Sequence, residues 1–318
     1  MSMARLRAKT RVRPEQGTSL PGTSAWRIVR TGNLRIIKSK RFEKFDWLVH
    51  GFSTRPGGGS VLEDPHSLQQ ARQKILNLRF TDWDLRETVE QNRRDFIASV
   101  NSRKCSLVTL RQIHSDVIHL VESPHPEIPS GDALITRTPG LLLSIQTADC
   151  IPILLADPKR RAVAAIHAGW RGTLACIAAK TVGRMQMAFG SRPEDLLAAL
   201  GPGIRQCCYE VGPEVVKEFS AQFPEARDWF DGPFDAMSSG EDPNPLPWLS
   251  MMPPGREPPP PRCHFDLFAA NTAILAAAGV KSKNISSLDL CTACRTDLLF
   301  SYRREGRTGR MMAVIGIL

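Results

Sequence analysis

The fold is decided by residues 131–172, which read GDALITRTPGLLLSIQTADCIPILLADPKRRAVAAIHAGWRG. Three short apolar runs lie inside this stretch, at 141–145, 151–156 and 162–166. Each is rich in Leu, Ile, Val or Ala and is bounded by Gly, Pro or charged residues, which is typical of buried strands rather than helices. Residues 157–160 (DPKR) carry proline at a turn position, so they predict that the second and third runs pair as a hairpin.

Polar and reactive side chains follow the ends of these predicted strands. Asp149 and Cys150 come after the first run, and His167 and Arg171 come after the third. Another histidine, His114, lies between two further predicted strands. Rigid buried strands hold reactive groups in fixed positions, as a preorganised site requires.

Two of the seven histidines and one cysteine form a candidate metal site. His114, Cys150 and His167 are separated by 36 and then 17 residues. Two imidazoles and a thiolate suit Zn²⁺, and three protein ligands leave a fourth position for water or substrate. Such long spacings are not diagnostic, so a core cysteine with two solvated histidines remains the alternative.

The remaining periodicity indicates a chain in which strands and helices alternate. Helical spacing occurs at 84–100, 172–188, 213–219 and 267–278. Strand-like runs occur at 34–37, 47–49, 107–110, 117–121, 196–200, 285–288 and 311–318. We find no internal repeat.

Composition predicts a cytoplasmic protein that does not enter a membrane. The chain has 318 residues, of which 42% are hydrophobic and 23% charged, as in ordinary globular proteins. No apolar run approaches the roughly 20 residues that span a bilayer, and the start lacks the apolar core of a secretory signal. Eight cysteines are too sparse for a disulfide scaffold at this length, which favours a reducing compartment.

Much of the net charge of +10 comes from a basic beginning. Residues 1–20 hold five Lys or Arg against one Glu and little that could be buried. We therefore expect residues 1–30 to form a disordered tail, with the folded domain at 31–318. A transit peptide or a nucleic-acid arm would also be basic, but short basic tails are unspecific, so nucleic acid is not the expected partner.

Three further segments stand out. A glycine-rich stretch follows 50–55 (HGFSTR), where backbone N–H groups and Arg55 could bind an anion, or where a plain surface loop could lie. Residues 221–262 hold eleven of the 24 prolines and predict an inserted loop, either a lid or a variable excursion. Cys291 and Cys294 form a lone C-x-x-C, which could be half a zinc knuckle or a redox pair, although structural packing is favoured because no second C-x-x-C exists.

Several motifs together resemble the laccase-domain family, first called multicopper polyphenol oxidase and now understood as zinc-containing purine nucleoside phosphorylases. The motifs are HGFSTR, QIH, TADC, HAGWRG, GPGIRQCCYEVG and CTAC…FSYRREGRTGR. The similarity covers about residues 33–318 except the proline-rich insertion. It implies a single-domain α+β fold, a four-layer α/β/β/α sandwich with mixed β-sheets. It also implies that His114, Cys150 and His167 bind Zn²⁺, for which Cu²⁺ could substitute.

The resemblance implies phosphorolysis of adenosine, inosine, guanosine or methylthioadenosine to base and ribose-1-phosphate, with adenosine deamination at the same site. Purine nucleosides and inorganic phosphate are then the expected partners. Such chemistry needs an anion clamp, for which Arg55 and Arg171 are the candidates. Asp149 could orient a metal-bound histidine or shuttle a proton, or could cap its own turn. Gln112 and Asn77 are candidate substrate contacts.

The chain departs from the family pattern at Ser115, where glycine is usual after Q-x-H, and in its longer 59–76 segment. Three rival functions also remain. A copper-dependent polyphenol oxidase is disfavoured, because a multicopper assembly needs many histidines and this chain has seven, with no H-x-H. A metal-independent hydrolase would use Cys150 as nucleophile and His167 as base. A nucleic-acid binder would leave the His/Cys set without a role.

Overall fold

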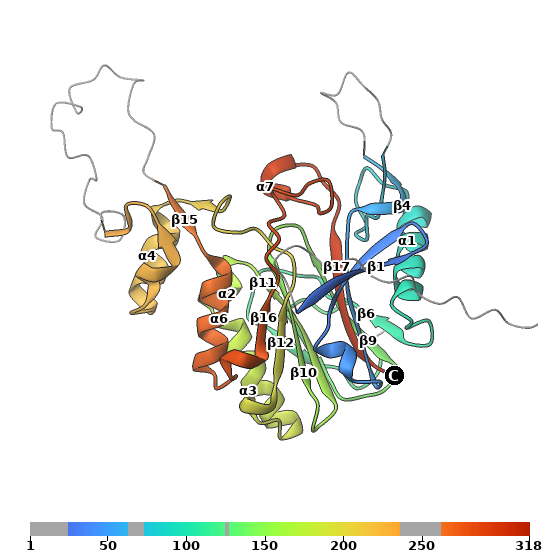
Figure 1. The fold of residues 1–318 in the computed structure, drawn as a ribbon, viewed down its shortest axis with the longest axis horizontal. Helices are drawn as coiled ribbons and strands as arrows, with labels where there is room; N and C mark the ends of the chain where they lie inside the picture. The colour runs from blue at the N-terminus through green and yellow to red at the C-terminus, as the bar shows by residue number, and fades with distance from the viewer. Residues whose placement is uncertain (1–24, 63–72, 125–126, 236–261) are drawn as a thin grey trace, which may run out of the picture.

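The structure is a computed structural model, and it describes residues 25–62, 73–124, 127–235 and 262–318 (Figure 1). Two six-stranded sheets form its centre, and the longer helices lie on the two outer sides. None of the helices in these ranges is long and apolar enough to cross a membrane.

The first sheet joins the two ends of the described chain. Its strand order is β1 (Trp26–Thr31), β2 (Leu34–Ser39), β3 (Leu48–Ser53), β17 (Met311–Ile317), β9 (Leu141–Thr147) and β6 (Ser106–Val108). The pairs are antiparallel except β6 with β9, which is parallel. The final strand therefore lies at the centre of the sheet, between strands from distant parts of the sequence.

The second sheet contains the predicted hairpin. Its order is β16 (Ile285–Ser287), β12 (Leu197–Leu200), β10 (Ile151–Asp157), β11 (Ala162–Ala168), β8 (Ala133–Thr136) and β7 (Ile118–Leu120). Strands β10 and β11 are antiparallel, with Ile151 opposite Ala168 and Asp157 opposite Ala162. The Asp157 carboxylate accepts the backbone N–H groups of Lys159 and Arg160, which fixes the turn.

Alternation along the buried strands shows how the layers pack. On β10, Ile153 and Leu155 belong to the core shared with the helices, whereas Leu154 and Ala156 belong to the core between the two sheets. Side chains alternate between the faces of a strand, so each strand of the hairpin fills two cores. The predicted four-layer α/β/β/α arrangement is confirmed.

Helices cover the outer faces of both sheets. Helices α2 (Trp170–Leu174), α3 (Ile177–Phe189) and α6 (Leu267–Ala277) cover the second sheet, and α1 (Arg86–Ser99) covers the first. The Asp266 carboxylate caps the start of α6 by accepting the Ala269 N–H. Smaller elements complete the described fold: β4 (Pro56–Val61), β5 (Lys74–Ile75), β13 (Glu210–Val211), α4 (Pro213–Gln222), β14 (Phe230–Asp231), β15 (Cys263–Phe265) and α7 (Tyr302–Glu305).

Four predictions about local structure need correction. Residues 26–30 of the expected tail lie in β1, while 1–24 lie outside the described residues. The glycine-rich stretch forms strand β4, paired with β5, instead of a loop. The expected helix at 172–188 is two helices, separated where Cys176 has φ 57°. The start of the expected 221–262 loop contains a 3-10 helix (Ala226–Trp229) and β14, and 236–261 are not described.

We predict that Leu154→Ala, between the two sheets, lowers the free energy of unfolding by about 2–5 kcal/mol, because it leaves a cavity at a fully buried site. The control Met187→Ala, at an exposed position of α3, should change it by less than about 0.5 kcal/mol. Urea denaturation followed by circular dichroism measures both values. Equal losses of unfolding free energy in the two variants would contradict the burial of Leu154 between the two sheets.

Candidate active site

The hairpin register brings two of the predicted ligands together. His167 lies opposite Pro152 in the β10–β11 pair, so Cys150, just before β10, is next to the end of β11. His114 comes from the loop between β6 and β7, where it has φ 59°. Its ring meets the His167 ring edge-on at a centroid distance of 4.9 Å. One ligand atom from each of His114, Cys150 and His167 lies within 4.8 Å of the others, so the group could hold a metal ion.

A glycine keeps this group compact. Gly169 follows β11, and a Cβ there would lie 2.9 Å from the Cys150 Sγ and 3.3 Å from the His114 Cδ2. A larger residue would therefore push the thiol and the imidazole apart. The first glycine of HAGWRG, Gly169, therefore has a structural reason, because the thiol and the imidazole approach it closely.

Asp132 organises the site, and our sequence reasoning missed it. Its fully buried carboxylate accepts a hydrogen bond of 2.7 Å from His167 Nδ1, which leaves Nε2 for a ligand. The same carboxylate accepts the N–H groups of residues 113–115 and the Ser115 hydroxyl. Ser115, the departure from the family pattern, thus adds one donor. The available signal in the sequence was an aspartate directly before the short apolar run at 133–135.

The ionised forms of Cys150 and His167 stabilise each other. Desolvation opposes ionisation of the Cys150 thiol, but the His167 charge and hydrogen bonds with both histidines outweigh it and lower the pKa to about 6. Burial likewise opposes protonation of His167, yet the Cys150 charge and the Asp132 hydrogen bond raise its pKa to about 9. The group therefore favours a thiolate, the form that binds metals and attacks electrophiles.

The three ligand residues line a cavity of about 910 Å³. Its wall includes the aromatic rings of Phe80, Tyr209 and Tyr302, and the arginines Arg79, Arg93, Arg303 and Arg310. A metal-binding group, aromatic faces and several positive charges therefore share one space.

Two of these arginines lie close enough to repel each other. Burial, and after it the positive charge of Arg79, lowers the pKa of Arg310. The Asn77 carboxamide oxygen accepts the backbone N–H groups of both Arg79 and Arg310, which holds their segments side by side. Both arginines therefore bring positive charge to the same part of the cavity.

The structure places the predicted phosphate contacts elsewhere. Arg55 is paired with Glu305 and donates to the Thr296 carbonyl, and it does not line the cavity. Arg171 lies over the Trp170 ring and is also absent from the cavity wall. Of the arginines that line the cavity, Arg303 and Arg310 belong to the FSYRREGRTGR motif, but neither was selected from the sequence as a phosphate contact.

The other predicted site residues, Gln112, Asn77 and Asp149, make hydrogen bonds within the protein. Gln112 lines the cavity, but its side-chain amide pairs with the backbone N–H and C=O of Gln146. Asn77 is buried, and its side-chain oxygen accepts the backbone N–H groups of Arg79 and Arg310. The Asp149 carboxylate accepts the hydroxyls of Thr292 and Ser301. It also accepts the Arg303 N–H, so Asp132, and not Asp149, orients a histidine.

Comparisons with known proteins give a family match and several relatives. Residues 49–318 match the family model described as multi-copper polyphenol oxidoreductase laccase. The chain is 38% identical over 270 residues to a purine nucleoside phosphorylase of Deinococcus radiodurans, covering 84% of this chain and 88% of that one. It is 34% identical over 209 residues to adenosine deaminase RL5 of an unknown prokaryotic organism, covering 63% and 70%.

A solved structure shows the same fold. YlmD from Geobacillus stearothermophilus superposes with a TM-score of 0.70 at 31% identity, covering 91% of this chain and 97% of that one. The family match spans the second sheet, all of the first sheet after β2 except Leu48, and the three proposed ligand residues. The resemblance found in the motifs is therefore confirmed, and the chain belongs to the multi-copper polyphenol oxidoreductase laccase family.

Proposed function

We propose that this protein is a zinc-dependent purine nucleoside phosphorylase that also deaminates adenosine at the same site. The observation that carries the proposal is the cavity that joins the His114, Cys150 and His167 group to paired arginines and aromatic rings. Relatives named purine nucleoside phosphorylase and adenosine deaminase support it. Purine nucleosides and phosphate are the proposed substrates.

The residues fit zinc. Two imidazoles and a thiolate of lowered pKa are ligands that Zn²⁺ prefers, and Asp132 fixes the His167 ring in the orientation that exposes Nε2. A bound zinc would supply a Lewis acid that polarises the purine or activates a water. His114, Cys150 and His167 would hold it.

The cavity offers separate contacts for base and phosphate. Phe80 and Tyr302 line the cavity, where a purine could contact their rings. Arg93 already lies over the Phe80 ring at 4.3 Å, and Arg310 lies over the Tyr302 ring at 5.4 Å. Arg79 and Arg310 replace Arg55 and Arg171 as the proposed phosphate clamp, because both line the cavity and Asn77 holds their backbone segments side by side. The clamp would hold phosphate for attack on the ribose anomeric carbon while the purine leaves.

A metal-independent hydrolase is the second candidate. The ionised Cys150 beside a protonated His167 is the pairing that a cysteine nucleophile requires. Metal content and the need for phosphate separate the two functions.

The first prediction from the proposed function concerns inosine. We expect metal-replete protein to convert it to hypoxanthine and ribose-1-phosphate only when phosphate is present. Cys150→Ala should abolish this turnover, because it removes a proposed ligand, whereas Cys105→Ala, outside the cavity, should retain it. Chromatography of base and sugar products measures both.

Other products would identify the rivals. Free ribose without a phosphate requirement would indicate a hydrolase. Inosine formed from adenosine, and lost in Cys150→Ala, would support deamination at the same site. Failure on inosine, adenosine and methylthioadenosine would rule out the phosphorylase.

The second prediction concerns Asp132. We expect Asp132→Asn to weaken zinc binding about 10- to 100-fold, because the carboxylate that orients His167 is lost. Asp116→Asn, which removes an exposed carboxylate paired with Lys180, is the matched control. Competition with a chromophoric chelator gives the affinities, and circular dichroism checks folding. Unchanged affinity in Asp132→Asn would refute its positioning role.

The third prediction separates the two phosphate assignments. Arg79→Gln should raise the KM for phosphate about 10- to 100-fold, as expected for one lost charge-assisted hydrogen bond. Arg94→Gln, on the exposed face of α1, should not change it. Initial rates at varied phosphate measure the effect. A large rise in Arg171→Gln with none in Arg79→Gln would restore the assignment made from the sequence.

A further inference from the structure

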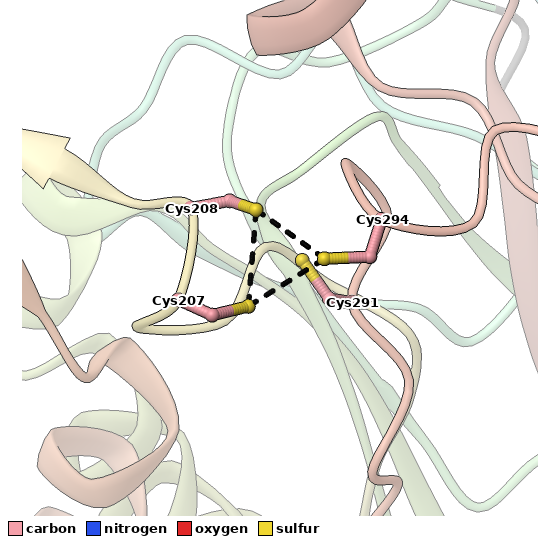
Figure 2. A group of neighbouring side chains, drawn as sticks. All are labelled: Cys207, Cys208, Cys291 and Cys294. Atoms are coloured by element: carbon pink, nitrogen blue, oxygen red, sulfur yellow. Dashed lines mark hydrogen bonds between the residues drawn. The ribbon is translucent and has the colours of Figure 1, made fainter.

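Four cysteines lie close together on the two loops that follow strands β12 and β16 of the second sheet (Figure 2). Cys207 and Cys208 follow β12, and Cys291 and Cys294 follow β16. Figure 2 shows their side chains converging. None of the four is in a disulfide. The C-x-x-C that looked incomplete in the sequence therefore has two partners from an adjacent cysteine pair.

The sulfur positions match those around a tetrahedral metal. The Sγ atoms of Cys207 and Cys208 are 3.8 Å apart, and those of Cys207 and Cys294 are 3.7 Å apart. Cys208 and Cys294 are 3.4 Å apart, and all four sulfurs lie within 4.8 Å of one another. A Zn–S bond of about 2.3 Å in a tetrahedron requires sulfurs about 3.8 Å apart.

We propose that Cys207, Cys208, Cys291 and Cys294 bind a structural zinc ion, separate from the His114, Cys150 and His167 group. Four thiolates fill a tetrahedral shell and leave no open position, which is the pattern of a structural site. The C-x-x-C supplies two ligands from one turn, and the adjacent pair supplies the other two.

The surroundings suit a tetrathiolate site. The Arg205 backbone N–H donates to the Cys291 Sγ at 3.5 Å, a hydrogen bond that would stabilise a metal-bound thiolate. Arg205 and Arg295 line the cavity beside the cysteines, and they are ion-paired with Asp289 and Asp297. Buried Ile204 and Ala293 pack against Cys291 on the inner side.

The ion would fasten two loops that shape the active-site cavity. The loops already meet where Thr292 N–H donates to the Gly203 carbonyl. Ile204 and Tyr209 of the first loop line the cavity, and Thr292 of the second donates to Asp149, which also lines it. The zinc would therefore hold the wall of the cavity without touching substrate.

The experiment counts zinc per chain in reduced protein of the Cys150→Ala background, where the other metal group lacks its thiolate. We expect one tightly held zinc, retained against a moderate chelator. Cys294→Ser and Cys207→Ser should lose it, whereas Cys105→Ser, at a half-buried cysteine outside the cluster, should keep it.

Cobalt substitution provides a readout that does not depend on the variants' folding. Co²⁺ in the Cys150→Ala protein should give intense sulfur-to-cobalt charge-transfer bands and tetrahedral visible bands. Stripping the metal should also lower its thermal midpoint. The proposal would be overturned by a zinc-free Cys150→Ala protein with all cluster thiols titratable, by a disulfide within the cluster, or by equal zinc loss in Cys105→Ser.

Discussion

The active site depends on one buried carboxylate. Asp132 has no exposed surface, so its charge must be satisfied by protein donors. Its donors come from two places, the His167 ring on β11 and the backbone of residues 113–115, which carries His114. The same interaction therefore satisfies a costly buried charge and fixes both histidines.

The sequence predicted the parts of the site that lie on long buried strands. Apolar runs identified β9, β10 and β11, and the turn at 157–160 identified their hairpin, so Cys150 and His167 could be placed together. Asp132 could not be recognised, because its donors are set by the tertiary fold. The contact of Arg55 with Glu305 could not be foreseen for a related reason, because Glu305 lies 250 residues away in the sequence.

Short elements and distant pairings limited the rest. Strands of two residues, such as β5 and β13, contain no periodicity to detect. Helical spacing continued across 172–188, although a left-handed residue at Cys176 breaks the helix there. The four-cysteine cluster depends on the parallel pairing of β12 with β16, which brings together cysteines 86 and 87 residues apart in the sequence. No local pattern reports such a pairing, so the C-x-x-C looked isolated.

The direction of the β10–β11 hairpin has an evolutionary consequence. Its turn lies at the Asp157 and Ala162 end, and the ligand residues lie at the Ile151 and Ala168 end. Insertions or deletions in the turn leave the pairing at the ligand end unchanged. A single-residue deletion inside β11 would instead turn His167 to the opposite face of the sheet. The hairpin pairing therefore constrains the length of the strands more strongly than the length of the turn.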